Sequence, residues 1–350
     1  MRFPQLNLGI RNNFTAVFGN RDLTLLLISN IGLWCGAHFI IILSPLLIVK
    51  LGGSILDTGL VFAISGAGSM LFIIPSGIVT DIINRKKIIL FGLVLSAVVS
   101  FLFTRINEWF MMIPLLILFR WSFSLNFLPR FALITDRTNS KNRAGVFGIM
   151  RIGFPIGGFL GLLGGGILID TLGWASTLSI ITIVIAASII PALFIQENDK
   201  RKRSRDQFKF ERRTFRTLIT FLFITALVST SVAALQPLLP IHLIEKFGAN
   251  NTMVGVFFAI SYLPFFTQMY SGAFADKFGK KKILLSALGM MVPLYVILST
   301  AGEYFHLALI YAFINLFYSM VDPASQAFLM DKTPTNIRGL STSMVAMGAR

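Results

Sequence analysis

The sequence predicts an all-α membrane protein built as two pseudo-symmetric six-helix bundles, and three observations support this fold class. Of the 350 residues, 55% are hydrophobic and only 13% are charged, and the mean hydropathy is +0.77. Soluble domains carry about a quarter charged residues, so this chain has more apolar surface than a soluble core could bury. Long apolar segments recur along the chain, and its two halves contain matching motifs. Continuous apolar segments of this length indicate helices, because membrane strands alternate between apolar and polar residues.

Ten apolar segments are long enough to cross the hydrocarbon core of a bilayer, which takes about 20 helical residues. In the first half they are expected at residues 23–49, 58–80, 88–104, 109–128, 144–169 and 175–195. In the second half they are expected at 218–243, 253–275, 283–300 and 307–324. An eleventh segment begins near residue 342 and reaches the last residue, Arg350.

The positive charge of the chain indicates its orientation in the membrane. There are 31 Lys and Arg residues against 15 Asp and Glu, a net charge of +16. If the N-terminus is cytoplasmic, 25 of the basic residues lie in cytoplasmic segments and three in outer loops. This distribution follows the positive-inside rule and needs no nucleic acid to explain it. Residues 1–22 are polar and basic, unlike a cleaved signal peptide. We therefore expect a multi-pass protein of the cell membrane with a cytoplasmic N-terminus.

The two halves of the chain contain matching residues at a fixed offset of 195 positions, which indicates a duplicated unit. The matching pairs are Gly77 and Gly272, Asp81 and Asp276, Asp136 and Asp331, and Arg143 and Arg338. A unit with an even number of spans gives both halves the same orientation, as in parallel repeats. The repeat also predicts that span 11 continues and that a twelfth follows, so the sequence is expected to be a fragment of a twelve-helix protein.

Four regions follow from the repeat and the charge pattern. They are a cytoplasmic N-terminus at 1–22, a six-helix bundle at 23–196, a basic cytoplasmic linker at 197–216, and an incomplete second bundle at 217–350.

The loop between spans 2 and 3 resembles the signature loop of the major facilitator superfamily, and the loop between spans 8 and 9 repeats it. The pattern is a glycine, an aspartate four residues later, and a glycine followed by basic residues. Asn84 replaces the last glycine in the first copy, whereas the second copy keeps Gly279. The resemblance covers essentially the whole chain. It implies a transporter fold in which Asp81 latches the halves together on the cytoplasmic side, toward the start of span 11.

The resemblance also implies that Asp276 is the counterpart of Asp81 and acts toward span 5. The basic residues of these loops are in part simple topology signals. The gating residues that the resemblance implies are Gly77, Asp81, Arg85, Lys86, Lys87, Arg143, Gly272, Asp276, Gly279, Lys280, Lys281 and Arg338.

Span 5 carries four glycines at a spacing of four residues, which places them on one helical face. They are Gly153, Gly157, Gly161 and Gly165. Small residues at this spacing allow two helices to approach closely in lipid. The string around Pro155 also loosely resembles the span-5 motif of proton-coupled drug antiporters, but it lacks the glycine directly before the proline.

Two ionisable residues are expected deep in the membrane, where a charge costs about 2.5–3.5 kcal/mol on insertion scales. Arg120 lies in the middle of span 4, a position where drug-exporting members of the superfamily often carry an arginine. It either serves transport or hydrogen-bonds neighbouring helices. Asp322 of span 10 either carries a proton, pairs with a cation as a lock, or breaks the helix together with Pro323.

Neutral polar residues in the spans complete the candidate substrate and proton pathway. They are Asn30 and His38 in span 1, Gln236 in span 7, Tyr262 and Gln268 in span 8, and Asn315 and Tyr318 in span 10. The resemblance implies that spans 1, 4, 7 and 10 line a central cavity. Arg120 and Asn315 occupy equivalent repeat positions and would face each other across it. His38 is either a packed helix residue or a titrating group.

No pattern in the sequence supports catalysis, a cofactor or a metal site. The histidines His38, His242 and His306 are scattered, and Cys35 is the single cysteine. The favoured hypothesis is a monomeric secondary transporter for a small-molecule substrate, working by alternating access with proton-coupled efflux of small hydrophobic or amphipathic compounds. The alternatives are an uptake symporter for an organic anion or other metabolite, and a non-transporting membrane receptor or scaffold.

Overall fold

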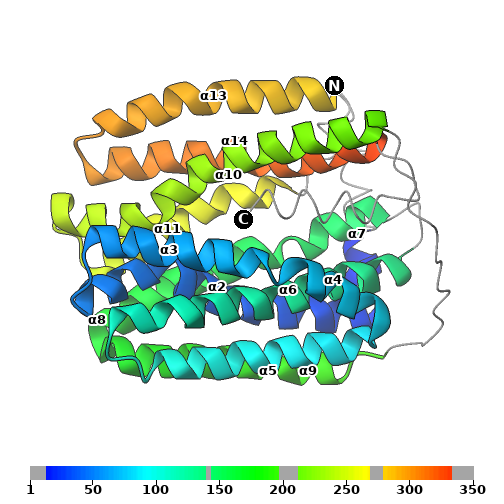
Figure 1. Ribbon diagram of the computed structural model, residues 1–350, viewed down its shortest axis with the longest axis horizontal. Helices are drawn as coiled ribbons and strands as arrows, with labels where there is room; N and C mark the ends of the chain where they lie inside the picture. Colours follow the sequence, from blue (N-terminus) through cyan, green and yellow to red (C-terminus); the bar gives the residue numbers. More distant parts are fainter. Residues whose placement is uncertain (1–12, 139–142, 197–211, 269–278, 333–350) are drawn as a thin grey trace.

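The computed structural model describes residues 13–138, 143–196, 212–268 and 279–332, and these ranges contain helices and turns without a strand. Helices of the first half, coloured blue to green, occupy the lower part of Figure 1, and α10, α11, α13 and α14 occupy the upper part. Six helices within the described ranges are long and apolar enough to cross a bilayer. The predicted all-α membrane fold is confirmed.

Each predicted span of the first half corresponds to one helix or to two consecutive helices. Spans 1 to 4 are α2 (Arg21–Lys50), α3 (Ile55–Met70) with α4 (Ile73–Ile82), α5 (Arg85–Phe103), and η1 (Trp109–Met111) with α6 (Met112–Asp136). Span 5 comprises α7 (Arg143–Met150) and the start of α8 (Gly153–Ala187), and span 6 comprises the rest of α8 and α9 (Ile189–Leu193).

The second half follows the same correspondence. Spans 7 to 10 are α10 (Arg212–Phe247), α11 (Asn251–Tyr262) with η2 (Leu263–Thr267), α13 (Lys280–Thr300) and α14 (Tyr304–Lys332). The predicted end of span 8 and the predicted start of span 11 lie outside the described residues.

Proline residues break the helices of spans 2 and 5, and in both spans the break lies four residues before the proline. A proline has no N–H to bond the carbonyl four residues earlier, and its ring clashes with that carbonyl. The chain leaves the helix at Leu71, four residues before Pro75, and at Arg151, four residues before Pro155. Span 8 contains Pro264 and changes there from α-helix to the 3-10 helix η2. Each of these spans therefore consists of two shorter segments.

Spans 5 and 6 are joined by a tight turn at Gly173 inside α8. Gly173 has φ 78° and ψ 172°, a combination that is open to glycine but costly for residues with a Cβ. Figure 1 shows α7 and α9 at the same end of the molecule, with the turn of α8 at the other end. A single residue thus reverses the chain between two membrane spans.

One face of α8, which we call the α2 face, carries the four evenly spaced glycines and packs against α2 within the first half. A Cβ atom at Gly157 would lie 2.5 Å from the Trp34 Cβ, and one at Gly161 would lie 2.1 Å from the Cys35 carbonyl oxygen. Real Cβ contacts are not this short, so the two helices pack backbone against backbone. The predicted close packing of span 5 is confirmed, and span 1 is its partner.

A second face of α8, which we call the α11 face, packs against the second half. A Cβ atom at Gly166 would lie 2.4 Å from the Asn251 carbonyl oxygen, and one at Gly255 of α11 would lie 2.4 Å from the Leu162 carbonyl oxygen. Helices α2 and α3 also contact α10. The halves therefore meet along α8 and α11 and along α2, α3 and α10.

The helices that follow the two signature loops begin in different ways. Asn84 has φ −55°, and its side chain accepts a hydrogen bond from the Lys87 N–H at 3.1 Å, which caps α5. Gly279, at the equivalent repeat position, has φ +93° and makes no side-chain cap for α13. The departure of the first loop from the superfamily pattern therefore supplies a helix cap.

Candidate functional site

Aromatic side chains from both halves surround His38 in the middle of span 1. Trp34 and His38 lie one turn apart on α2 and stack with ring centroids 5.0 Å apart. Phe154 of α8 lies 4.7 Å from Trp34 and 4.8 Å from His38. Tyr262, the last residue of α11, lies 4.6 Å from His38 and 5.4 Å from Phe154. These rings connect the first bundle to the second.

Three more rings extend this group to spans 4 and 10. Phe123 of α6 lies 4.4 Å from Trp34, Phe265 of η2 lies 5.1 Å from Phe154, and Tyr318 of α14 lies 6.2 Å from Phe265. Most of the pairs are edge-to-face or tilted, the arrangements that aromatic quadrupoles favour. We call the group of Trp34, His38, Phe123, Phe154, Tyr262, Phe265 and Tyr318 the aromatic cluster.

Five rings of the aromatic cluster keep accessible surface although they lie where the halves meet. They are Trp34, Phe123, Phe154, Tyr262 and Tyr318, all half-buried. His38 and Phe265 are 5% and 6% exposed. A close-packed interior would leave such rings without accessible surface. Part of the aromatic surface of the cluster is therefore accessible.

The hydrogen bond of His38 determines how its ring faces the aromatic cluster. Its Nδ1 lies 2.7 Å from the Trp34 carbonyl oxygen. A carbonyl oxygen can only accept, so Nδ1 carries the proton and donates it. In the neutral ring Nε2 is then a hydrogen-bond acceptor. The structure brings His38 together with Tyr262 and Tyr318, which the sequence had also indicated as cavity candidates.

Span 4 contributes the half-buried Arg120, which the sequence indicated, and the buried Arg130, which it did not. Arg120 lies with its Cζ 5.9 Å from the centre of the Phe62 ring of α3. Arg130 is 5% exposed and donates to the Leu26 carbonyl at 3.0 Å and to the Ser29 hydroxyl at 2.9 Å, both on α2. The sequence ends span 4 at residue 128, but α6 continues to Asp136 and includes Arg130.

The remaining pathway candidates lie on separate helices. Asn30 faces Gly153 of α8, where an added Cβ would lie 3.0 Å from the Asn30 Nδ2. Asn315 is buried and donates to the Tyr311 carbonyl at 2.9 Å. Arg120 contacts Phe62, and the expectation that it faces Asn315 stays a prediction. Gln236 of α10 and Gln268 after η2 are half-buried, and Asp322 belongs to α14, with its side chain outside the described residues.

A polar contact joins the halves near the Gly173 turn, at the end that the predicted topology places outside, and the sequence gave no indication of it. Asp170, near the Gly173 turn of α8, accepts hydrogen bonds from the N–H and the hydroxyl of Thr252, both at 2.7 Å. The Asn251 side chain donates a third bond at 2.7 Å. Thr252 and Asn251 form the first turn of α11, whose free N–H groups and positive dipole end favour a carboxylate. We call these residues the outer contact.

The outer contact changes the proton affinity of Asp170. Burial alone would raise the pKa of this carboxyl, but the hydrogen bonds from Thr252 and Asn251 outweigh it and lower the pKa below its ordinary value. The carboxylate is therefore charged at neutral pH and holds the start of α11.

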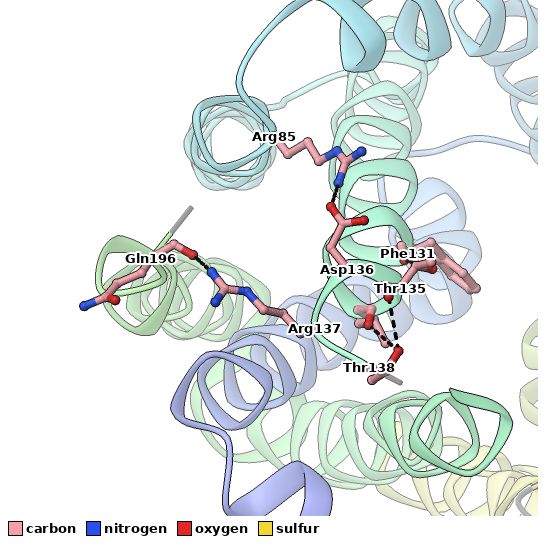
Figure 2. A network of polar contacts seen from close by, with 8 residues as sticks. Arg85, Phe131, Thr135, Asp136, Arg137, Thr138 and Gln196 are labelled. Atoms are coloured by element: carbon pink, nitrogen blue, oxygen red, sulfur yellow. Dashed lines mark hydrogen bonds and ion pairs between the residues drawn. The ribbon is translucent and has the colours of Figure 1, made fainter. Parts of the chain in front are cut away.

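Ionic contacts join the ends of the first-half helices that the predicted topology places on the cytoplasmic side (Figure 2). Arg85 at the start of α5 pairs with Asp136 at the end of α6. Arg137 pairs with Asp22 of α2 at 2.9 Å. It also donates to the Gln196 carbonyl, as Figure 2 shows. The Gln196 N–H donates to the Asp22 carboxylate at 3.0 Å. These contacts connect spans 1, 3, 4 and 6 into one unit.

The structure places only part of the signature residues. Gly77 and Asp81 belong to α4, Arg85, Lys86 and Lys87 begin α5, Arg143 begins α7, Gly279 precedes α13, and Lys280 and Lys281 begin it. The Asp81, Arg143 and Lys280 side chains and the whole of Gly272, Asp276 and Arg338 lie outside the described residues. The cytoplasmic latch therefore stays a prediction. In the described part of the chain no group of three His, Cys, Asp or Glu residues could hold a metal ion.

Two bundles of membrane-length helices with matching sequence motifs are typical of transporters built from parallel repeats. Comparison with known sequences identifies the family. The sequence profile of the Major Facilitator Superfamily matches residues 25–348, and the chain belongs to this superfamily.

Curated relatives are distant in sequence. An uncharacterized MFS-type transporter of Bacillus subtilis is 25% identical over 174 residues, 46% of this chain and 44% of the relative. One of Methanocaldococcus jannaschii is 24% identical over 322 residues, 86% of this chain and 77% of the relative. The multidrug resistance protein MdtG of Salmonella arizonae is 24% identical over 224 residues, 61% of this chain and 55% of that protein. The matched stretch thus spans about half the length of the first and third relatives.

Solved structures share the fold. A bacterial homologue of the human lysosomal transporter Spinster, in an inward-facing and unoccupied conformation, superposes with a TM-score of 0.72 at 18% identity, covering 94% of this chain and 78% of that one. The nucleoside transporter NupG, as a mutant, superposes with a TM-score of 0.75 at 14% identity, covering 94% of this chain and 88% of that one.

Proposed function

We propose that this protein is a secondary active transporter that moves a small solute across the cell membrane by alternating access. The observation that carries the proposal is the aromatic cluster, which draws rings from both halves and keeps accessible surface. A solute bound there contacts both bundles, so its binding free energy depends on how the bundles are arranged. This dependence is what couples binding to a conformational change.

The outer contact supports alternation between two arrangements. It consists of a few hydrogen bonds to Asp170 and lies beside a close approach of Gly166 to Gly255, while ionic contacts hold the first half together. An interface of this kind can separate while each bundle stays intact. We infer that the basic residues 197–216 link the two bundles on the cytoplasmic side and that the transporter is monomeric, with a cytoplasmic N-terminus.

Proton-coupled efflux of small hydrophobic or amphipathic compounds is the mode that we favour. The aromatic cluster presents apolar surface suited to such compounds, and the multidrug resistance protein MdtG is among the relatives of this chain. His38 and Asp322 are the proposed proton carriers, because a carrier must titrate within the pathway.

Uptake of an organic anion is the second candidate, and Arg130 favours it. The hydrogen bonds of this buried cation go to neutral groups, and its Nε has no hydrogen-bond partner among the described residues. A buried cation without an acidic partner raises the potential of span 4 and attracts anions. Arg120, ten positions earlier on the same helix, adds a second positive charge.

The test is substrate-dependent proton flux in proteoliposomes, measured with a pH-sensitive dye for a panel of amphipathic compounds and organic anions. The parent is compared with Asp322→Asn, His38→Gln and Arg120→Ala. Proton movement that depends on an amphipathic compound and is lost in Asp322→Asn or His38→Gln supports efflux. Flux limited to anions and lost in Arg120→Ala supports the second candidate. Folded protein that moves no compound overturns both and favours a receptor or scaffold.

A further inference from the structure

We propose that the aromatic cluster selects planar aromatic compounds that carry an N–H or O–H donor, and that His38 Nε2 accepts the hydrogen bond from that donor. This inference rests on the proposed function, since it names the substrate class of the same site.

The first step is the availability of the His38 acceptor. The Trp34 carbonyl fixes the proton on Nδ1, so Nε2 has a free lone pair in the neutral ring. The ring neighbours of His38 are Trp34, Phe154 and Tyr262. The hydrogen bonds of the described residues include none to Nε2, and His38 itself is 5% exposed. An acceptor in such apolar surroundings discriminates strongly between solutes with and without a donor.

The second step is the shape of the surface around that acceptor. Trp34 and Phe154 meet at an interplanar angle of 80°, and Trp34 and Phe123 at 63°. Half-buried rings set at steep angles offer both a face and an edge to a third ring. A flat solute can therefore stack on one ring and meet the edge of another, which are the two favourable aromatic geometries. A bulky aliphatic solute gains no comparable contact.

A simpler interpretation is that the rings only pack the two halves together. Ring packing would explain the short centroid distances, but it predicts no preference for a solute with a donor and no role for Nε2. A pair of probes that differ in one donor separates the two interpretations. Acridone is flat and uncharged and carries one N–H, and N-methylacridone has the same ring system without that donor.

The experiment measures equilibrium binding of both probes, by fluorescence, to the full chain in lipid nanodiscs. We expect acridone to bind the parent about tenfold more tightly than N-methylacridone, the effect of one hydrogen bond in an apolar site. His38→Phe keeps a ring but removes the acceptor, so the two affinities should become equal. His38→Gln keeps an acceptor and should retain part of the preference. Trp34→Leu should weaken both probes alike.

Phe101→Leu is the matched control, because Phe101 is a 48% exposed ring on α5 outside the aromatic cluster. It should leave both affinities unchanged. Equal binding of the two probes to the parent, or a preference that persists in His38→Phe, would overturn the inference. Measurable binding of both probes by His38→Phe itself shows that its lost preference does not come from misfolding. The binding measurement does not depend on transport. If the parent prefers acridone but moves no compound in proteoliposomes, the proposed function is overturned and the inference about the selective site is not.

Discussion

The two faces of α8 use the same small residue for different purposes. On the α2 face, glycines from Gly153 to Gly165 seat the helix on α2 along several turns, inside one bundle. On the α11 face, the backbone approach is concentrated near the outer end, at Gly166, and is joined there by the polar contact of Asp170. The comparison indicates that the first face is permanent and the second can separate. Four predictions break or sharpen this distinction.

The largest effect is expected from Gly161→Ala on the α2 face. The new Cβ would meet the Cys35 carbonyl oxygen, a backbone atom that cannot move without displacing α2. We expect a loss of about 3 kcal/mol or more in unfolding free energy, at the upper end of overpacking costs. The measurement is chemical unfolding in detergent. Gly164→Ala is the control, since no atom lies within 4 Å of its added Cβ, and equal midpoints for both variants would contradict the permanent role.

Gly166→Ala on the α11 face should shift the arrangement of the halves and leave each bundle folded. The clash with the Asn251 carbonyl penalises only the closed outer side, by about 1–3 kcal/mol, or roughly fivefold to 150-fold in the ratio of closed to open molecules. Distances between spin labels at the exposed positions Leu172 and Phe305, in a Cys35→Ser background, report that ratio. An unchanged distance distribution, or a drop in unfolding free energy as large as that of Gly161→Ala, would show that the two faces do not differ.

A smaller shift in the same direction is expected from Asp170→Asn. The substitution removes the charge that the start of α11 favours, but the groups that lose it are exposed and can bond to water. The expected cost is about 1 kcal/mol or less. The spin-label distances should therefore show partial opening, less than in Gly166→Ala. If Asp170→Asn opens as completely as Gly166→Ala, the polar contact rather than the glycine packing stabilises the closed state.

The smallest effect is expected from pH. The pKa of Asp170 is lowered, so the outer contact is stable above the ordinary aspartate pKa of about 3.9 and is lost as the pH falls through the lowered value. Between pH 5 and 8 the label distances should not change through Asp170. In Asp170→Asn any residual pH response must come from another group. A transition of the parent near pH 6 that disappears in this variant would contradict the assignment.

The fold was predictable because its signals are local or periodic. Apolar length located the spans, the offset of 195 positions revealed the duplication, and glycine spacing identified the packed face of span 5. The breaks at Pro75 and Pro155 could have been predicted from the missing N–H. The predicted span 4 ended before Arg130, because an arginine in the sequence looks like the end of an apolar segment. In the structure its hydrogen bonds go to neutral groups of α2.

The candidate site was predictable only in part. His38, Tyr262 and Tyr318 stood out because they are polar residues within spans. Phe123, Phe154 and Phe265 did not stand out, because 34 phenylalanines are spread through the chain. A phenylalanine suits a lipid-facing position as well as a core position, so its presence does not indicate a site. Their convergence depends on how five helices pack, and that arrangement is not encoded in any local pattern. Among the other members of the cluster, only Trp34 could have been recognised locally, because it lies one helical turn before His38.

The unequal starts of α5 and α13 have a consequence for tolerance to mutation. Position 84 needs a side-chain oxygen, so serine, threonine or aspartate could replace Asn84 at little cost. Position 279 needs a positive φ, and no atom lies within 4 Å of an added Cβ, so backbone strain alone restricts it to glycine, with asparagine as the next best residue. Saturation mutagenesis should therefore find a permissive site and a restricted site at the same point of the duplicated unit. Once the two copies had diverged in this way, neither residue could be exchanged for the other without loss.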